Sequence, residues 1–590
     1  MAQRLITLMQ QRGTVICRLP DASPSWGIFS EPEHIVAPRT PDAVIEAIEY
    51  IERCLDAGMY AAGFIAYEAA TAFELNAATK ELDNNFPLAW FALYSKPPEI
   101  FNPIAVAPCE PLAAGEPELS RATYANSLNS VQDELEQGNI YQANFTFRTH
   151  GQPIMEPEQF FLHLFNVHPA PYAAFINTGD LQIISNSPEL FLHKTGTKII
   201  SSPMKGTAKR HALPAADRKI AELLPQDPKT RAENLMITDM VRNDLGRICS
   251  PGTVHTEPLF QVDTYNTLHQ MISTVSGELE PNISLQAILN ATFPPASITG
   301  APKLSAMSLI KRLEKSPRKL YTGSIGAFMP NGDCCLNVAI RTLINSAQGS
   351  ELGVGGGIVY DSETEAEWHE ALLKSRFTRF VQPKFELLET MLYEQGEILW
   401  LDAHLDRIGA SQQYFNRPWD RNALMRTVIQ AVKNLTTPSR IRLLLNNNGK
   451  ITIEHYPLTH IGWGTGPHRL KISPLHTDSN NLFLYHKTTL RDFYNQQFTE
   501  ATATGFAEVV FTNERHELTE GSISSIFIQQ NGQWRTPALE CGLLPGIWRQ
   551  KMLKELNAVA AIITLDELHN ADKIIIGNSV RGKLEITSVI

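Results

Sequence analysis

Apolar residues recur at helical spacing in the segment that begins at Ser120, and Gly138 follows them. These apolar positions are Tyr124, Leu128, Val131 and Leu135. Steps of three or four residues place side chains on one face of a helix, and glycine is common just beyond a helix end. The pattern therefore predicts a helix that starts after Ser120 and ends before Gly138.

Strand-like apolar runs alternate with longer helical patterns up to about residue 381, and the pattern restarts at Pro383. The run FELLETMLYEQGEILWL, 385–401, is typical of two strands joined by a turn that contains glycine. A proline-rich stretch from Lys96 to Pro117 indicates a connection between subdomains. We therefore expect three divisions, residues 1–118, 119–382 and 383–590.

Length and composition favour a globular protein with several cores. The chain has 590 residues, against ~150 residues for a typical domain. Hydrophobic residues make up 43% and charged residues 19%, which is ordinary globular usage. The net charge is -11 and no Lys/Arg cluster occurs, so we expect no nucleic-acid partner.

The cysteines and the apolar runs bear on the cellular setting. Seven cysteines are scattered without C-x-x-C spacing, so neither a disulfide framework nor a structural zinc site is favoured. There is no signal-like apolar region at the N-terminus and no run of ~18 apolar residues. We expect a soluble, cytoplasmic protein with no membrane partner.

Carboxylates gather on two predicted helices. Glu233 lies in the segment 230–247, one turn before apolar positions that we expect to face inward: Leu235, Met236, Met240 and Val241. In the segment 361–377, Glu367 and Glu370 fall three apart on one face, after a Ser362/Glu365 pair with capping-box spacing. Carboxylates from two helices suit Mg²⁺ held partly by a substrate. Spacing alone favours a solvated acidic face.

The glycine-rich run ELGVGGGIVYDS, 351–362, is not a dinucleotide fingerprint, because position 358 is isoleucine. A strand whose glycines, Gly356 and Gly357, let backbone N–H groups approach a small anion is the better interpretation. A plain tight turn is the alternative.

Several motifs in the first two thirds resemble the chorismate-utilising enzymes, a family that contains anthranilate synthase component I, aminodeoxychorismate synthase component I and isochorismate synthase. The motifs occur in the expected order between about 120 and 380. They are SNSPELF (185–191), SSPMKGT (201–207), DPKTRAENLMITDMVRNDLGR (227–247), FPPASITGAPKLSAM (293–307), YTGSIG (321–326), AIRT (339–342), GGGIV (355–359) and EAEWHEALLKSR (365–376). The resemblance implies an α+β class, with antiparallel sheets flanked by helices.

The same resemblance implies roles for individual residues. Glu233 and Glu370 match Mg²⁺ ligands, with Glu367 acting through water, and Glu189 matches the general acid at the ring 4-hydroxyl. Groups that match the walls of the chorismate pocket are Thr207, His269, Lys303, Tyr321 and Arg341.

Two positions indicate which reaction the first part performs. Lys205 in PMKGT stands where anthranilate and isochorismate synthases usually carry alanine, and it matches the nucleophile of aminodeoxychorismate synthases. Gln142 in YQANF stands where water-activating members have a lysine base. Nothing in the chain resembles a glutamine amidotransferase, so the resemblance implies that a partner subunit supplies ammonia.

The last third resembles fold-type IV pyridoxal-phosphate enzymes, which have two subdomains and include branched-chain and D-amino-acid aminotransferases and aminodeoxychorismate lyase. The resemblance rests on HLDRI (404–408), LFLYHKTTLRDFY (482–494), ELTEGSISSIFI (517–528) and LLPGIWR (543–549). Lys487 matches the Schiff-base lysine and Glu520 the carboxylate at the pyridine nitrogen. Residues that match phosphate contacts are Arg407, Ile547, Trp548, Asn578 and Ser579.

Together the two resemblances imply p-aminobenzoate synthesis for folate. Chorismate would be aminated, and pyridoxal 5'-phosphate would serve the elimination of pyruvate. The alternative is an anthranilate synthase-like enzyme fused to a branched-chain or D-amino-acid aminotransferase-like domain, since only context favours a lyase. A binding protein on a decayed scaffold is disfavoured by the complete set of candidate residues. The oligomeric state stays open, and a homodimer through the last domain is one candidate form.

Overall fold

The computed structural model describes residues 2–21, 25–82, 86–101, 109, 112–266, 268–379, 383–463 and 468–590. Its contacts divide the chain into two compact units. The first comprises Met1–Ala208, Glu222–Thr264 and His269–Gln382, and the second comprises Lys209–Ala221, Tyr265–Leu268 and Pro383–Ile590.

The first unit is built on two large antiparallel sheets. The order of the first sheet is β18-β8-β22-β21-β10-β9-β1-β2-β6, with β7 also paired to β8. Its strands are β1 (Thr14–Arg18), β2 (Trp26–Phe29), β6 (Glu99–Phe101), β7 (Glu116–Pro117), β8 (Gln142–Gly151), β9 (Tyr172–Asn177), β10 (Gln182–Ser187), β18 (Gly300–Ala301), β21 (Thr342–Ser346) and β22 (Gly349–Ile358).

The second sheet runs β14-β17-β12-β11-β20-β19-β4-β5-β3. Its strands are β3 (His34–Val36), β4 (Tyr60–Ile65), β5 (Ala89–Tyr94), β11 (Leu190–Thr195), β12 (Lys198–Ser202), β14 (His255–Thr256), β17 (Val275–Glu278), β19 (Ser324–Phe328) and β20 (Cys334–Val338). A small third sheet joins β13 (Met204–Lys209), β16 (Leu268–Ile272) and β15 (Gln261–Thr264) in the order β13-β16-β15.

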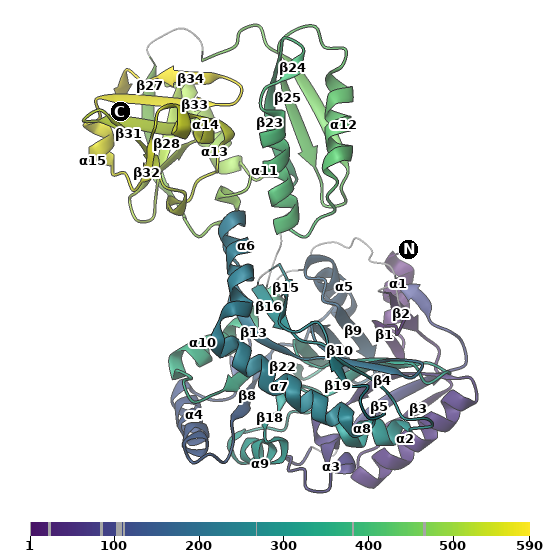
Figure 1. Cartoon of the computed structure of the whole chain (residues 1–590). Helices are drawn as coiled ribbons and strands as arrows, with labels where there is room; N and C mark the ends of the chain where they lie inside the picture. Colours follow the sequence, from purple (N-terminus) through teal and green to yellow (C-terminus); the bar gives the residue numbers. More distant parts are fainter. Residues whose placement is uncertain are drawn as a thin grey trace. The chain divides into compact units, whose positions relative to one another are not determined.

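Three hydrophobic cores hold these layers together. One core lies between the two large sheets, where Val15 and Ile176 of the first face Phe64 and Trp90 of the second. The other two lie beneath the helices that cover the outer faces (Figure 1). These helices are α1 (Ala2–Met9), α2 (Pro41–Asp56), α3 (Ala70–Phe73), α4 (Arg121–Glu136), α5 (Pro157–Val167), α7 (Pro228–Gly246), α8 (Leu285–Thr292), α9 (Lys303–Leu313) and α10 (Thr364–Leu373).

The helix predicted after Ser120 is confirmed as α4, which Ser120 caps by accepting a hydrogen bond from the backbone N–H of Thr123. The strand predicted over 351–362 is confirmed as β22. The proline-rich stretch lies partly outside the described residues. Its described ends form β6 and β7, which belong to the first sheet.

Two local predictions were wrong. Leu235 does not face inward and is 52% exposed, because the buried face of α7 instead carries Asn234 and Ile237. Asn234 Nδ2 donates to the Lys205 backbone O at 3.1 Å, which explains a polar residue on that face. The capping box at α10 is absent: Glu363 is the N-cap, and Ser362 Oγ instead donates to Glu367 Oε1 at 2.8 Å.

The second unit contains three smaller sheets, and the two strands predicted over 385–401 are confirmed in the first of them. That sheet joins β24 (Glu397–Ile398), β23 (Leu387–Glu394), β25 (Ser439–Leu445) and β26 (Ile451–Pro457). The next joins β29 (Leu518–Gly521), β28 (Glu508–Asn513), β27 (Arg469–Thr477) and β35 (Ser588–Val589). The last joins β32 (Val559–Ala561), β31 (Gln533–Pro537), β30 (Ser525–Gln530), β33 (Lys573–Asn578) and β34 (Gly582–Glu585).

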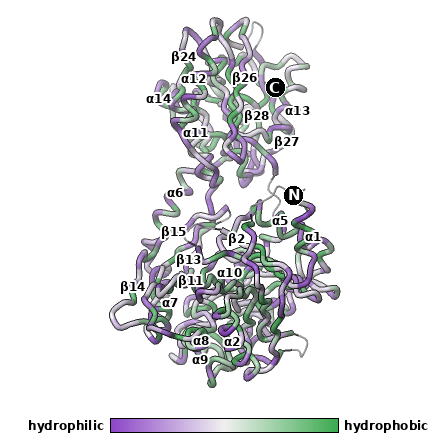
Figure 2. The backbone as a smooth tube through the Cα atoms, turned by 90° about the vertical axis from the view of Figure 1, so that its right-hand side faces the viewer, coloured by the Kyte–Doolittle hydropathy of each residue, from purple (hydrophilic) through white to green (hydrophobic). Residues whose placement is uncertain are grey.

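The helices of the second unit pack on these sheets. They are α11 (Leu401–Tyr414), α12 (Arg421–Val432), α13 (Asp492–Ala503), α14 (Ile547–Glu555) and α15 (Leu565–His569), with most of α6 (Pro214–Leu223). Hydrophobic stretches of the chain run through the interior of each unit (Figure 2).

The segment 209–221 belongs to the second unit although it comes from the middle of the sequence, as does the short segment 265–268. Arg210 is buried there: its Nε donates to both Asp217 oxygens at 2.8–2.9 Å, and its Nη2 donates to the Tyr414 backbone O at 3.0 Å. The guanidinium also lies over the Tyr414 ring, 4.1 Å from its centroid. These contacts anchor the segment to α11.

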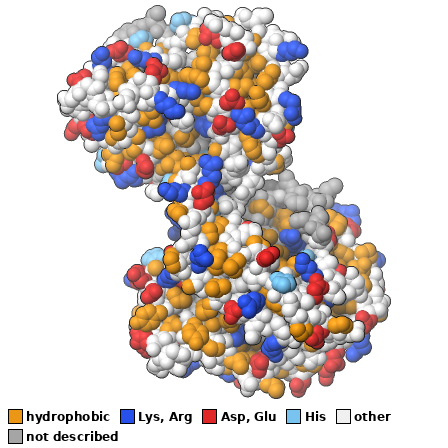
Figure 3. Space-filling model, viewed as in Figure 1, with side chains coloured by type: hydrophobic (Ala, Val, Ile, Leu, Met, Phe, Trp, Pro, Cys, Tyr) orange, Lys and Arg blue, Asp and Glu red, His pale blue; other side chains and the backbone are white. Residues whose placement is uncertain are grey.

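The surface carries charges of both signs. On the face drawn in Figure 3, acidic and basic side chains are interspersed. All seven cysteines are free. Within the described ranges, no helix combines the length and the apolar character that crossing a bilayer demands.

Candidate active sites

Lys205 stands on β13 and reaches toward β8 and β22 of the first sheet. Its Nζ donates to Asn144 Oδ1 at 3.3 Å. Gly357 lies beside them, and a β-carbon at this position would lie 2.3 Å from Gln142 Nε2 and 2.9 Å from Asn144 Oδ1. The lack of a side chain at Gly357 therefore leaves room for the Lys205 amine.

The environment of Lys205 favours a neutral amine. The pKa of Lys205 is lowered to about 8, mainly by burial; the carboxylates of Glu189 and Glu233 oppose this shift, and the charge of Lys374 adds to it. A neutral amine carries the lone pair that a nucleophile needs. Near neutral pH a useful fraction of Lys205 is thus able to attack an electrophilic carbon.

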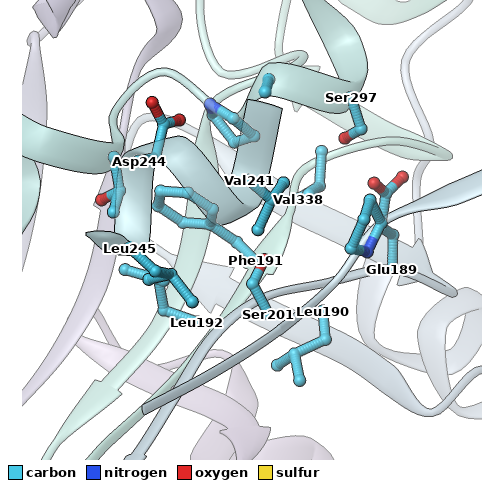
Figure 4. Close-up of a pocket in the computed structure, with 14 residues that line it drawn as sticks. Glu189, Leu190, Phe191, Leu192, Ser201, Val241, Asp244, Leu245, Ser297 and Val338 are labelled. Carbon is cyan, nitrogen blue, oxygen red and sulfur yellow. The ribbon is translucent and has the colours of Figure 1, made fainter. Parts of the chain in front are cut away.

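Glu189 is buried beside the same lysine and borders a small cavity. The close-up in Figure 4 shows its carboxylate near Ser297, with Phe191 and Val241 further along the lining and Asp244 beyond them. Burial raises the pKa of Glu189 to about 7, although Ser297 and Lys205 oppose the rise. Its Oε1 has no hydrogen-bond partner among the residues that the structure describes. A carboxyl group of this kind is suited to donate a proton near neutral pH.

Glu233, Glu367 and Glu370 act on one another electrostatically from α7 and α10. Burial raises the pKa of Glu233 and of Glu367, and each is raised further by the charge of Glu370. Glu370 itself pairs with Lys374, Oε1 to Nζ 2.9 Å, and this charge lowers its pKa. Among the described residues, no group of three or more acidic, His or Cys side chains is close enough to hold a metal ion. Glu233 and Glu370 therefore remain candidate ligands for a hard cation that takes most of its oxygens from a substrate and water.

Gln142 and Thr207 lie near Lys205, and His269 lies on the strand β16 that neighbours β13. Gln142 is 1% exposed, and no group in the described part of the chain forms a hydrogen bond with its Oε1. Thr207, two residues after Lys205, donates to Gln270 Oε1 at 3.1 Å. His269 precedes Gln270 on β16, and its Nδ1 lies 2.9 Å from Thr264 Oγ1. The strands β13 and β16 are adjacent, so Thr207 and His269 lie on neighbouring strands of the small third sheet, whereas Gln142 comes from β8 of the first sheet.

Four further candidates have structural contacts of their own. Lys303 is engaged with Asp244, Nζ to Oδ2 2.8 Å. Tyr321 packs against Gly353, on the face of β22 that also carries Gly357. The Arg341 backbone O accepts from the N–H of Asn186, three residues before Glu189. A β-carbon at Gly356 would lie 3.3 Å from Glu367 Oε2, which places Gly356 at the acidic cluster.

The second unit has a cavity of about 370 Å³ that contains Lys487 and Glu520. Burial lowers the pKa of Lys487 to about 7, with Arg491 and Arg407 acting in the same direction. Burial raises the pKa of Glu520 to about 7 against the charge of Arg491. Tyr494 OH donates to Glu520 Oε1 at 3.4 Å. A buried carboxylate of this kind fits a ligand that brings a positive ring nitrogen.

Arg407 lies in the same cavity but is already paired. Its Nε and Nη2 donate to Glu389 at 2.8 Å and 2.6 Å, and His404 Nδ1 lies 2.7 Å from the same carboxylate. Burial alone would raise the pKa of Glu389, but the charges of Arg407 and His404 hold it at about 2. Only the Nη1 edge of Arg407 is therefore available to an anion.

The N-terminus of α14 also borders this cavity. Ile547 and Trp548 are its first two residues, after the N-cap Gly546, which provides no side chain to cap the helix. First-turn N–H groups lack intrahelical partners, and such N-termini bind phosphate. Asn578 and Ser579 border the cavity as well. Asn578 Oδ1 accepts from the N–H of Val580 at 3.0 Å and thus orders the loop.

Sequence reasoning missed partners that only the fold brings close. They are Asn144 and Lys374 in the first site, and Glu389, Arg440, Arg442 and Arg491 in the second. The signals available were Asn144 two positions after Gln142 on a strand, and the alternating pair Arg440/Arg442.

Two family matches cover most of the chain. Residues 110–379 match the family described as chorismate binding enzyme, and residues 386–589 match amino-transferase class IV. The crystal structure of anthranilate synthase component I from Streptococcus pneumoniae TIGR4 covers 62% of this chain and 91% of its own length, with a TM-score of 0.51 and 23% identity. That likeness shows the fold of the first part.

Curated relatives match over the first part. Aminodeoxychorismate synthase, chloroplastic, from Arabidopsis thaliana is 40% identical over 264 residues, which is 44% of this chain and 29% of the relative. Aminodeoxychorismate synthase component 1 from Escherichia coli K12 is 38% identical and covers 43% of this chain and 56% of the relative. Anthranilate synthase component 1 1 from Haloarcula marismortui is also 38% identical, covering 45% and 54%. The chain thus spans about half the length of these relatives or less, and overall identity does not separate the two activities.

Proposed function

We propose that this chain, of which residues 110–379 match the chorismate binding enzyme family and residues 386–589 the class IV amino-transferase family, makes p-aminobenzoate from chorismate for folate synthesis. The first unit would aminate chorismate to 4-amino-4-deoxychorismate. The second would eliminate pyruvate from that product. We keep residues 1–118, 119–382 and 383–590 as the proposed functional divisions.

Lys205 is the observation that carries the first half of the proposal. Its amine has a pKa near neutrality and lies in the space that Gly357 leaves free. We assign it as the nucleophile that adds to C2 of chorismate while the 4-hydroxyl leaves with the Glu189 proton. Ammonia then adds at C4, and the C2–N bond to Lys205 breaks. The C2–N bond forms as the C4–O bond breaks, and the C4–N bond forms as the C2–N bond breaks, so Lys205 recovers its free amine.

Gln142 supports amination over addition of water. A buried carboxamide does not take a proton from water at neutral pH, so the position lacks a general base. The anthranilate synthase-like alternative is disfavoured by Lys205. Glu233 and Glu370 would hold Mg²⁺ together with the ring carboxylate of chorismate, and the bound ion would supply positive charge there.

Lys487 and Glu520 support the second half. Pyridoxal 5'-phosphate, held by the α14 N-terminus, Arg407 and Glu520, would supply an electron sink when bound. The neutral Lys487 amine is suited to take the C4 proton of the substrate, and Glu520 to keep a proton at the pyridine nitrogen. Loss of pyruvate then leaves an aromatic ring, which makes the step irreversible.

A product assay tests the proposal directly. The purified chain with chorismate, ammonium, Mg²⁺ and pyridoxal phosphate is expected to release p-aminobenzoate and pyruvate in equal amounts. Anthranilate or isochorismate as the main product would contradict the assignment. Lys205→Ala should abolish amination, whereas Lys198→Ala, at an exposed lysine on β12, should not change it.

The ammonia donor is tested in the same assay. We propose a separate glutamine amidotransferase subunit as the donor. The chain alone is then expected to be nearly inactive with glutamine and active with ammonium. Adding such a subunit should restore the use of glutamine, and strong glutamine-dependent turnover without it would contradict this partner.

A further inference from the structure

The cavity around Lys487 carries more positive charge than the cofactor needs. Five arginines, one lysine and one glutamate border it. Arg407 is paired with Glu389, and the proposed function already assigns roles to Lys487 and Glu520. The arginines that remain are Arg440, Arg442, Arg491 and Arg581.

Arg440 and Arg442 point from one face of β25 into this cavity. Alternate residues of a strand share a face, so the two Cα atoms are ~7 Å apart along the same wall. Thr390 of β23 lies directly opposite Arg442 and also borders the cavity. This wall of the cavity is therefore formed by the paired strands β23 and β25.

Neither of these arginines is firmly neutralised. Arg442 Nη1 lies 3.5 Å from Glu454 Oε2, and both side chains are more than one third exposed, so the pair is weak. Arg440 lies over the Tyr456 ring, 4.7 Å from its centroid, and no carboxylate within the described residues forms an ion pair with it. Their guanidinium groups are available to an anion.

Arg491 adds a third cation on the Lys487 side. It follows Lys487 by four residues, and its Nη2 donates to the Ser522 backbone O. Its guanidinium lies over the Tyr494 ring, 5.3 Å from the centroid. Among the ion pairs of the described chain, none joins Arg491 to a carboxylate.

We propose that Arg440 and Arg442, with Arg491, form a carboxylate-binding wall that selects a ring amine bearing two carboxylates. An α-amino acid brings a single carboxylate and would leave part of this positive charge unpaired in the cavity. Aminodeoxychorismate brings one carboxylate on the ring and one on the enolpyruvyl group. Guanidinium groups bind carboxylates through paired N–H donors, which fixes orientation as well as charge. This inference rests on the proposed lyase function and names the residues that give it specificity.

Chorismate is a suitable probe, because it has both carboxylates but a hydroxyl in place of the 4-amine. The full chain loaded with pyridoxal phosphate is titrated with chorismate in the absence of ammonium, and the visible absorbance of the bound cofactor reports binding in the second unit only. The comparison probe is 4-hydroxybenzoate, with a single carboxylate. We expect chorismate to bind at least about tenfold more tightly.

Arg440→Met and Arg442→Met should each weaken chorismate binding by about tenfold to a hundredfold, while cofactor content stays normal. Arg442→Lys should restore part of the loss. Arg426→Met, at an exposed arginine on α12, should change nothing. Equal binding of the two probes, or unchanged chorismate binding in both Met variants, would overturn the proposal.

A second readout separates this inference from the proposed function. Wild-type chain is given aminodeoxychorismate, and p-aminobenzoate release is measured. If chorismate binding depends on Arg440 and Arg442 but no p-aminobenzoate forms, the carboxylate wall stands and the lyase assignment falls. If p-aminobenzoate forms at the same kcat/KM in the Met variants as in wild type, the wall is wrong and the lyase stands.

Discussion

Gly357 approaches Lys205 so closely that a β-carbon on Gly357 would stand 3.0 Å from the Lys205 Nζ. The other atoms in the way are also the ends of side chains, Gln142 Nε2 and Asn144 Oδ1. These ends can move at little cost to the fold, but the amine would then leave its position. A side chain at position 357 should therefore affect catalytic activity much more than the stability of the fold.

Gly357→Ala is expected to lower amination by about a hundredfold, because displacement of a reacting group by ~1 Å has an effect of that size. The free energy of unfolding should change by less than ~1 kcal/mol. Steady-state kinetics and thermal unfolding measure the two quantities. Gly246→Ala, at a glycine with open space around it, serves as control and should leave both nearly unchanged. A Gly357→Ala enzyme with normal kcat/KM would show that the close approach is unimportant.

The pH dependence of amination should be bell-shaped. Lys205 acts when neutral, so activity rises with pH through about 8, and Glu189 acts when protonated, so activity falls as pH rises through about 7. The product of the two fractions is largest between these values, and its limbs report the pair of groups. The measurement is kcat/KM across pH at a constant concentration of free ammonia. A profile that keeps rising to pH 10 would contradict Glu189 as the acid.

Removing one metal-binding carboxylate should imitate chelation. Glu370→Gln and Glu233→Gln are expected to raise the Mg²⁺ concentration needed for half-maximal amination by about tenfold or more, since each removes a negative ligand. Glu365→Gln is the matched control, because Glu365 lies on the same helix but pairs with Arg121. Amination that persists in excess EDTA would leave these glutamates without a metal role.

The second unit should be separable from the first by mutation. Lys487→Ala is expected to abolish the visible absorbance of bound cofactor and to stop the pathway at aminodeoxychorismate, which accumulates at the wild-type rate. Glu520→Gln should retain cofactor but slow pyruvate release, because an unprotonated pyridine is a poor electron sink. Product analysis by chromatography distinguishes these cases. Undiminished p-aminobenzoate from Lys487→Ala would require another role for the domain.

The sequence alone predicts a feature when the residues that interact lie close together in the chain. The α4 helix and its Ser120 cap were predictable, because the period and the cap lie within one short segment. The inward face of α7 was not, because Asn234 is buried with hydrogen-bond partners far along the chain, the Lys205 backbone O and the Ser273 hydroxyl. Glu389 was missed for the same reason: its partners His404 and Arg407 lie on a helix that the hydrophobic pattern does not connect to β23.

The place of the segment 209–221 in the fold could not be predicted from the sequence. It begins four residues after Lys205, yet it belongs to the second unit, where the Ala212 backbone O lies 3.1 Å from His486 Nε2. His486 is buried, precedes Lys487, and lies 2.9 Å from Ser411 Oγ through its Nδ1. Burial lowers the pKa of His486 to about 3, so a neutral imidazole makes these contacts.

Arg210→Ala should therefore disturb the Lys487 site from a distance. It removes the cationic partner of the buried Asp217 carboxylate, and breaking a buried ion pair destabilises by ~3–5 kcal/mol. We expect a lower melting temperature of the second unit, a weaker affinity for pyridoxal phosphate and an altered absorbance of the bound cofactor. Arg218→Ala, at an exposed position of the same helix, is the control. If Arg210→Ala leaves the melting temperature and the cofactor spectrum unchanged, the segment is not part of the structure that positions Lys487, and the second unit folds without it.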